Sequence, residues 1–240
     1  NDKVEVTLKD VNIDTSSRKK AAVSVTGEGD TNIKLDGDNA LKSDIYRSGI
    51  YGSGSLTISG GENDSLTAQG GSGANGISSS GSLTISGGTV TANGDDGGHG
   101  IYSRGGVTIS GGSTVTANGG NGGSLVGGDG IRSGGGLTVS DGTVTAKGGN
   151  GDSKDGYGGD GIRSGGVVTI SGNTVNAAGG YGGKVGGYGI CSFDRVAISG
   201  GTVEAAGGNG STGGGSGIYS SVIDLSGSLE LTAKAGSPNG

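Results

Sequence analysis

The stretch Gly-Ser-Leu-Thr-Ile-Ser-Gly-Gly-Thr-Val-Thr-Ala-Asn-Gly, residues 81–94, contains two short runs in which apolar and polar residues alternate. In the first run Leu83 and Ile85 flank a threonine, and in the second Val90 and Ala92 do the same. Alternation with a period of two is typical of a strand that buries one face. The glycines between the runs indicate a tight turn. The stretch therefore predicts two consecutive short strands.

A Gly-Ile dipeptide recurs along the chain and marks a repeat. Successive isoleucines are separated by 27, 24, 30, 31, 28 and 28 residues. Six residues after each of the first six comes an apolar-x-apolar triplet, and a third alternating run follows it. Self-similarity at such a period indicates a solenoid. Three strands per unit predict an all-β fold, a right-handed three-sided parallel β-helix of roughly eight to nine coils. The isoleucines are Ile50, Ile77, Ile101, Ile131, Ile162, Ile190 and Ile218.

The composition fits a solenoid better than an ordinary globular core. The chain has 63 glycines in 240 residues, whereas about 7% is usual. Leu, Ile, Val and Phe together make up only 46 residues, which borders on the composition of disordered chains. The formal net charge of −6 is low for disorder, and a single proline without a three-residue glycine period excludes collagen. Stacked coils can share a thin continuous core, so few apolar residues suffice.

The repeat predicts one β-helix domain over residues 1–240. Residues 1–48 form N-terminal coils, 49–216 carry the regular Gly-Ile repeats, and 217–240 form a C-terminal coil or cap. The alternation from Val4 to Ile13 predicts a single opening strand, and the last coil drifts out of phase with the repeat.

Glycine-rich segments of variable length close the units and are expected to project from one corner. Their role is open between mobile filler and the adaptable rim of a site. They are residues 70–75, 94–99, 119–129, 148–160, 179–188 and 207–216.

Several functional classes are disfavoured by the sequence. No run of about 18 apolar residues is present, so no membrane span is predicted. Residues 1–30 lack a signal-peptide pattern, so we expect a secreted protein to be present here in its mature form. One cysteine cannot form an internal disulfide, and no Cys/His cluster offers a zinc site. The acidic charge balance argues against a nucleic-acid partner.

Two rows of residues are expected on the outside of the Gly-Ile strands. The row after each isoleucine is Tyr51, Ser78, Tyr102, Arg132, Arg163, Cys191 and Tyr219, and the row before each Gly-Ile is Ser48, Asn75, His99, Asp129, Asp160, Tyr188 and Ser216. Stacking of the coils would gather a central patch, the candidate ligand-binding residues His99, Tyr102, Asp129, Arg132, Asp160, Arg163 and Tyr188.

Three interpretations of this patch stay open. It can be a surface lattice of ion pairs with a structural role. It can be a sugar-binding strip, in which Arg and Asp contact hydroxyls or uronates and Tyr rings stack on sugars. In a third version Asp129 and Asp160 are calcium ligands and an arginine is the base of a lyase. We expect His99 to lie on the surface, and Cys191 has no second histidine to activate it as a nucleophile.

Threonines are expected on the outside of the third run of each unit. The Thr-x-Thr pairs are Thr89 and Thr91, Thr114 and Thr116, and Thr143 and Thr145. Such ladders on a flat solenoid face resemble those of ice-binding proteins, in which regular hydroxyls and methyls order water. Threonine is also favoured in any solvated sheet, and Glu204 interrupts the continuation of the rows.

The repeats carry a resemblance to known families. Units such as residues 81–94 look like the repeats of clostridial and gut-bacterial surface proteins. The stretch Ala21-Ala22-Val23-Ser24-Val25 through Ile33-Lys34-Leu35-Asp36-Gly37-Asp38-Asn39-Ala40-Leu41 is similar to the opening of a β-helical carbohydrate-binding family. That resemblance implies binding of plant cell-wall polysaccharides, calcium as a cofactor, and kinship in shape with polysaccharide lyases.

These observations lead us to expect an extracellular, cell-surface binding or adhesion module rather than an enzyme. Its expected partner is a polysaccharide, either a host or a cell-wall glycan. An ice-binding protein and a polysaccharide lyase are the alternatives.

Overall fold

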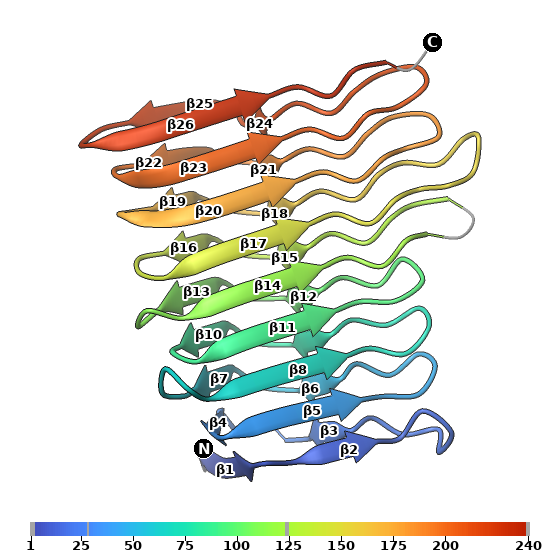
Figure 1. Cartoon of the computed structure of the whole chain (residues 1–240), viewed down its shortest axis with the longest axis vertical. Helices are drawn as coiled ribbons and strands as arrows, with labels where there is room; N and C mark the ends of the chain where they lie inside the picture. Colours follow the sequence, from blue (N-terminus) through green and yellow to red (C-terminus); the bar gives the residue numbers. More distant parts are fainter. Residues whose placement is uncertain (1–2, 28, 123–124, 239–240) are drawn as a thin grey trace.

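The protein is an all-β solenoid, seen in a computed structural model that describes residues 3–27, 29–122 and 125–238 (Figure 1). Three parallel sheets run the length of the stack, and no helix occurs among the described residues. The chain passes through the three sheets in turn, and this confirms the prediction of a three-sided parallel β-helix. The right-handed sense of the coils stays a prediction from the chirality of parallel crossovers.

Each sheet takes one strand from each coil. Sheet A contains β1 (Val4–Lys9), β4 (Thr31–Asp36), β7 (Leu56–Ser59), β10 (Leu83–Ser86), β13 (Val107–Ser110), β16 (Leu137–Val139), β19 (Val168–Ile170), β22 (Arg195–Ile198) and β25 (Val222–Leu225). Sheet B contains β2 (Asn12–Asp14), β5 (Asp38–Lys42), β8 (Ser65–Gln69), β11 (Thr89–Asn93), β14 (Thr114–Asn118), β17 (Thr143–Lys147), β20 (Asn173–Ala178), β23 (Gly201–Ala206) and β26 (Leu229–Lys234). Sheet C contains β3 (Val23–Val25), β6 (Ile50–Gly52), β9 (Ile77–Ser79), β12 (Ile101–Ser103), β15 (Ile131–Ser133), β18 (Ile162–Ser164), β21 (Ile190–Ser192) and β24 (Ile218–Tyr219).

The core is a set of ladders of identical or similar side chains. In sheet C, Ile101 lies in register with Ile77 on one side and with Ile131 on the other, and all three are fully buried. Burying one such side chain contributes about 1.5–3 kcal/mol. Because neighbouring coils share these contacts, the interior forms one continuous cluster from Leu8 to Ala205.

The two ends of the chain differ from the sequence-based expectation. Val4 to Ile13 is not one strand, because Asp10 takes a left-handed conformation (φ 47°) and turns the chain from β1 in sheet A to β2 in sheet B. The last coil is not out of phase: Ile223 pairs with Val196 in register. The chain is one residue shorter between Ile218 and Ile223 than between Ile190 and Val196, and the corner absorbs this difference.

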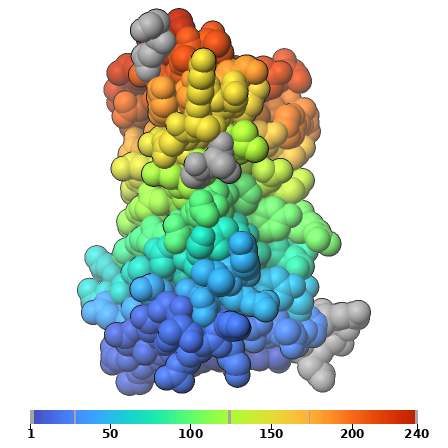
Figure 2. All heavy atoms as spheres, turned by 90° about the vertical axis from the view of Figure 1, so that its right-hand side faces the viewer, coloured from blue at the N-terminus to red at the C-terminus, as the bar shows by residue number. Residues whose placement is uncertain are grey.

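The glycine-rich segments 70–75, 94–99, 119–129, 148–160, 179–188 and 207–216, here called the glycine-rich corner, connect sheet B to sheet C. Figure 2 looks onto this corner and shows the coils following one another in sequence order along the stack. Residues 123–124 of one segment lie outside the described residues. In the described parts the outgoing and returning arms pack backbone against backbone, as Gly119 does against Gly128 and Gly148 against Gly159.

A chain of backbone hydrogen bonds links these arms through the stack. Within one coil Gly128 N–H donates to the carbonyl of Gly120, at 2.8 Å. Gly149 N–H of the next coil then donates to Gly128, and Gly159 N–H donates to Gly149, at 2.8 and 2.9 Å. The same alternation continues through Gly180, Gly187, Gly208, Gly215 and Gly236. These segments are therefore a hydrogen-bonded layer, and the expectation of mobile filler does not describe them.

Candidate functional site

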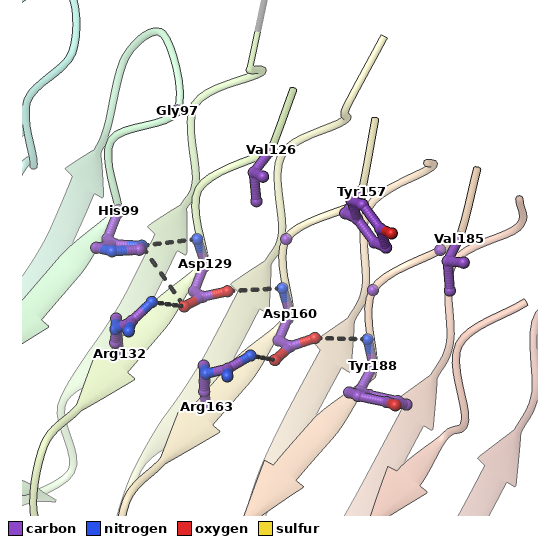
Figure 3. Close-up of a pocket in the computed structure, with 15 residues that line it drawn as sticks. Gly97, His99, Val126, Asp129, Arg132, Tyr157, Asp160, Arg163, Val185 and Tyr188 are labelled. Atoms are coloured by element: carbon purple, nitrogen blue, oxygen red, sulfur yellow. Dashed lines mark hydrogen bonds and ion pairs between the residues drawn. The ribbon is translucent and has the colours of Figure 1, made fainter. Parts of the chain in front are cut away.

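The central candidate site is a pocket of about 470 Å³, where the outer face of sheet C meets the glycine-rich corner (Figure 3). We call it the arginine pocket. Its inner wall is formed by His99, Asp129, Arg132, Asp160, Arg163 and Tyr188, and its outer wall carries Val126, Tyr157 and Val185. It spans four successive coils, from His99, which precedes β12, to Tyr188, which precedes β21.

Six of the seven residues proposed from the sequence line this pocket. Arg132 and Arg163 are in register on adjacent strands β15 and β18, so their guanidinium groups lie one above the other. Tyr102 does not line the pocket but stacks on His99, with ring centroids 5.8 Å apart. The grouping follows from the constant offset of each residue from its core isoleucine.

The row that precedes each Gly-Ile dipeptide forms a ladder of side-chain-to-backbone hydrogen bonds. His99 N–H donates to Asn75 Oδ1, and Asp129 N–H donates to His99 Nδ1, both at 2.8 Å. Asp160 N–H donates to Asp129 Oδ1 at 2.8 Å, and Tyr188 N–H donates to Asp160 Oδ1 at 2.7 Å. The side chains of Asn75, His99, Asp129 and Asp160 thus each bind the backbone of the next coil.

His99 is a structural acceptor rather than a free surface histidine. Its side chain is only 20% exposed, and burial lowers its pKa from the usual value. Because Nδ1 accepts the Asp129 N–H, a neutral ring carries its proton on Nε2. The expectation that His99 simply lies on the surface was wrong, because the glycine-rich corner folds over the outer face of sheet C at this point.

The two aspartates are buried, whereas their arginine partners are partly exposed. Asp129 Oδ2 lies 3.4 Å from Nη1 of Arg132, and Asp160 Oδ2 lies 3.1 Å from Nη1 of Arg163. Asp129 and Asp160 are 5% and 4% exposed, so these pairs are not the surface lattice considered from the sequence. Each carboxylate has one oxygen on a backbone N–H and the other on a guanidinium. The pairing engages one nitrogen of a group that has five N–H donors.

The ionised form of Asp160 is disfavoured by its surroundings. Burial, and then repulsion by Asp129 in the neighbouring coil, raise the pKa of Asp160 to about 6. The backbone N–H of Tyr188 and the charge of Arg163 act in the opposite direction but do not offset this increase. Strongly shifted acids in a pocket are frequent at functional sites.

The outer wall was not identified from the sequence. Val126, Tyr157 and Val185 are joined in register by parallel bridges. Tyr157 is 43% exposed, and the ammonium group of Lys184 lies 5.7 Å from the centre of its ring. The signal in the sequence is a large apolar or aromatic residue at the position that precedes a Gly-Gly pair in each of three successive glycine-rich segments.

Cys191 belongs to the row of Arg163 and Tyr219, yet it is only 1% exposed. Burial raises the pKa of its thiol to about 11. A buried thiol that stays protonated at neutral pH is a poor nucleophile.

Calcium binding finds little support in the donor groups. In the described part of the chain no group of three or more His, Cys, Asp or Glu residues is placed to hold a metal ion. The oxygens of the two candidate ligands, Asp129 and Asp160, already accept hydrogen bonds. Calcium stays an expectation from the resemblance alone.

The threonine pairs form two registered rows on the outer face of sheet B. Thr89, Thr114 and Thr143 are exposed and aligned, and the second row of Thr91, Thr116 and Thr145 is half-buried. Both rows carry threonine together for three coils. The first row continues through Thr174 and Thr202, whereas Asn176 and Glu204 replace threonine in the second row.

Comparison with known proteins adds evidence on the repeat. A family model described as a β-helix repeat matches residues 83–101 and 137–162. No curated protein and no solved structure matches the chain. No helix in the described residues is long and apolar enough to cross a membrane. The matched repeats and the three stacked parallel sheets together describe a β-helix repeat protein.

Proposed function

We propose that the protein is an extracellular surface-binding module that binds a polysaccharide in the arginine pocket. The observation that carries this proposal is that the two walls of the pocket differ in chemistry. The inner wall presents guanidinium groups, and the outer wall presents the apolar surfaces of Val126, Tyr157 and Val185. A sugar ring has hydroxyls at its edge and apolar C–H faces, so it suits such a pocket. The resemblance of the repeats to bacterial surface proteins supports the cell-surface location, and the resemblance of residues 21–41 to a carbohydrate-binding family supports the polysaccharide partner.

The arginines are held in the way that a binding site requires. Asp129 and Asp160 anchor one side of each guanidinium from within the protein, which reduces the side-chain entropy that a ligand must overcome. A uronate carboxylate or a pair of hydroxyls can accept the remaining N–H groups. Because the arginines come from adjacent strands, they can contact neighbouring units of one polymer.

We expect the double variant Arg132→Ala/Arg163→Ala to lose binding to polysaccharide. A hydrogen bond from a charged donor contributes about 1.5–3 kcal/mol, so removal of both arginines lowers the affinity at least about 100-fold. Retention on insoluble polygalacturonate, xylan and cellulose measures this loss. Arg104→Ala is the matched control, because Arg104 is exposed and does not line the pocket. Absence of retention by the unaltered protein, or equal retention by the double variant, would contradict the proposal.

A lyase is the less favoured alternative for this pocket. A lyase of the type considered needs carboxylates that bind metal and a base close to the substrate, and both aspartates are committed to backbone and arginine partners. Formation of unsaturated products from uronate polymers, followed by ultraviolet absorbance with and without calcium, distinguishes an enzyme from a binding module.

Ice binding is favoured by one observation, the two registered threonine rows on sheet B. At about 4.8 Å per strand the three coils cover roughly 10 Å of regular face, which is short for an ice-ordering surface. If this face acts on ice, the protein shapes ice crystals and Thr116→Lys removes the effect. Lack of thermal hysteresis in the unaltered protein disposes of this alternative.

A further inference from the structure

A second hollow lies on the outer face of sheet C, toward the N-terminal end of the stack. It encloses about 280 Å³ and is lined chiefly by Tyr46, Arg47 and Tyr51. Tyr51 follows the core residue Ile50 in β6, in the row that also contains Arg132 and Arg163. Its registered neighbours, Ser24 and Ser78, have small side chains, which leaves space beside the Tyr51 ring.

Tyr46 is held in a conformation that tyrosine seldom adopts. Its φ of 58° lies in the left-handed region, which costs a bulky residue on the order of 1–3 kcal/mol. The backbone is fixed by a hydrogen bond from Tyr46 N–H to the carbonyl of Ser72, at 2.8 Å. The ring lies against Gly73, where a Cβ would be 3.0 Å from two ring carbons, and yet the residue is 77% exposed. The structure thus holds an aromatic ring in solvent at an energetic cost.

Arg47 differs from the two arginines of the central pocket. Arg132 and Arg163 each pair with an aspartate, whereas no described carboxylate lies within 4.0 Å of the Arg47 guanidinium. Arg47 is exposed, next to two tyrosines. An unpaired guanidinium beside aromatic rings can donate to the hydroxyls or carboxylates of a sugar that stacks on those rings.

We propose that Tyr46, Arg47 and Tyr51 form a second polysaccharide subsite, and that one polymer chain laid along sheet C occupies both this subsite and the arginine pocket. The proposal rests on the proposed function. From β6 to β15 the row advances by three strand spacings, so Tyr51 and Arg132 are separated by about 14 Å along the stack. Half-buried Tyr102 lies in the same row between them. An oligomer long enough to bridge this distance makes contacts at both subsites, while the entropy of association is lost only once.

The test measures affinity as a function of oligomer length. Oligogalacturonides and xylo-oligosaccharides, in graded series from disaccharide to dodecasaccharide, are titrated calorimetrically into the unaltered protein. We expect weak binding of the shortest oligomers and a rise of at least about tenfold once the oligomer spans both subsites.

The variant Tyr46→Gly/Arg47→Gln is expected to remove this rise and to leave the affinity of the shortest oligomers for the arginine pocket unchanged, because neither residue lines that pocket. Glycine tolerates the positive φ at position 46, so the fold is preserved while the ring is lost. Tyr181→Ala is the control, because Tyr181 is an exposed tyrosine that lines neither pocket. Short oligomers that bind without any gain from length, or a gain that survives in the variant, overturn the second subsite alone. Failure of the unaltered protein to bind any oligomer or polymer overturns the proposed function together with it.

Discussion

Replacement of Gly149 by alanine is expected to destabilise the fold by at least about 3 kcal/mol, the upper part of the range for overpacking. A Cβ at Gly149 would overlap the carbonyl carbon and oxygen of Gly120 in the preceding coil. Both are backbone atoms, so no side-chain rotation relieves the clash. Separation of the two coils would also break the hydrogen bond from Gly149 N–H to the carbonyl of Gly128. Neighbouring coils stabilise one another in a solenoid, so the damage spreads beyond one coil.

Gly213→Ala provides the matched control within the same corner. A Cβ at Gly213 would have no atom within 4 Å, and its φ is not positive. Alanine there restricts the unfolded chain and is expected to be neutral or to stabilise by about 0.4–1 kcal/mol. Thermal unfolding followed by circular dichroism compares the two variants, and the midpoint of Gly149→Ala should fall by roughly 6–12 °C. Equal midpoints would show that the corner does not contribute to stability.

The sequence was sufficient to predict the three sheets because the apolar residues of the core recur at the same positions in successive repeats. Ile101, Val107 and Val115 belong to one coil, and apolar residues occupy the equivalent positions in the neighbouring coils. Each of these positions predicts one of the three sheets. The glycine-rich corner leaves no such pattern. Backbone hydrogen bonds hold its arms together, and the lack of Cβ atoms allows the backbones to approach closely. In the sequence these features are visible only as an excess of glycine.

The part of the candidate site that lies at fixed positions relative to the core residues was predicted from the sequence, and the part in the glycine-rich corner was not. Asp129 and Arg163 keep a constant offset from a core isoleucine, so stacking brought their rows together. Val126 and Tyr157 lie in segments of variable length, and no core residue nearby fixes their register. The burial of Asp129 and Asp160 also depends on this corner, because its arms cover the outer face of sheet C. What looked like a surface ion-pair lattice is therefore a ladder that connects the coils.

Asp160→Asn is expected to stabilise the fold at pH 8 by about 1–2 kcal/mol, although it removes an ion pair. The pKa of Asp160 is raised from 3.8 to about 6, which corresponds to a cost of up to about 3 kcal/mol when the carboxylate is ionised. Asparagine keeps an oxygen to accept the Tyr188 N–H and carries no charge into the buried site. The favourable pairing with Arg163 is already part of this net shift, so its loss does not reverse the gain.

The pH dependence follows from the direction of the shift. The folded state holds the Asp160 proton more tightly than the unfolded state, so protonation favours folding. Below about pH 3.8 both states are protonated and the cost is absent, and it grows as the pH rises until the folded carboxyl has ionised above about pH 6. Backbone and side-chain hydrogen bonds lower the pKa values of Asp14, Asp44 and Asp64, and their stabilising contributions are lost only at pH values below this window. His99 also titrates in this interval with the opposite sign, because burial lowers its pKa and its protonation disfavours folding as the pH falls. Comparison of Asp160→Asn with the unaltered protein at each pH cancels the His99 contribution and isolates Asp160.

Calorimetric melting at pH 4.5, 6 and 8 tests this prediction, since the stability gained by Asp160→Asn over the unaltered protein should grow from pH 4.5 to pH 8. Asp224→Asn is the control, because Asp224 forms an exposed pair with Arg195 and its loss should have little effect. A variant less stable than the unaltered protein at pH 8 would mean that pairing with Arg163 exceeds the cost of burial.

If Asp160→Asn is instead more stable than the unaltered protein, as predicted, the chain retains the Asp160 carboxylate at a cost in folding stability. Its anchoring of Arg163 in the arginine pocket then becomes the physical reason to keep it, and the same variant should bind uronate polymers less tightly at pH 8 because that arginine is no longer held.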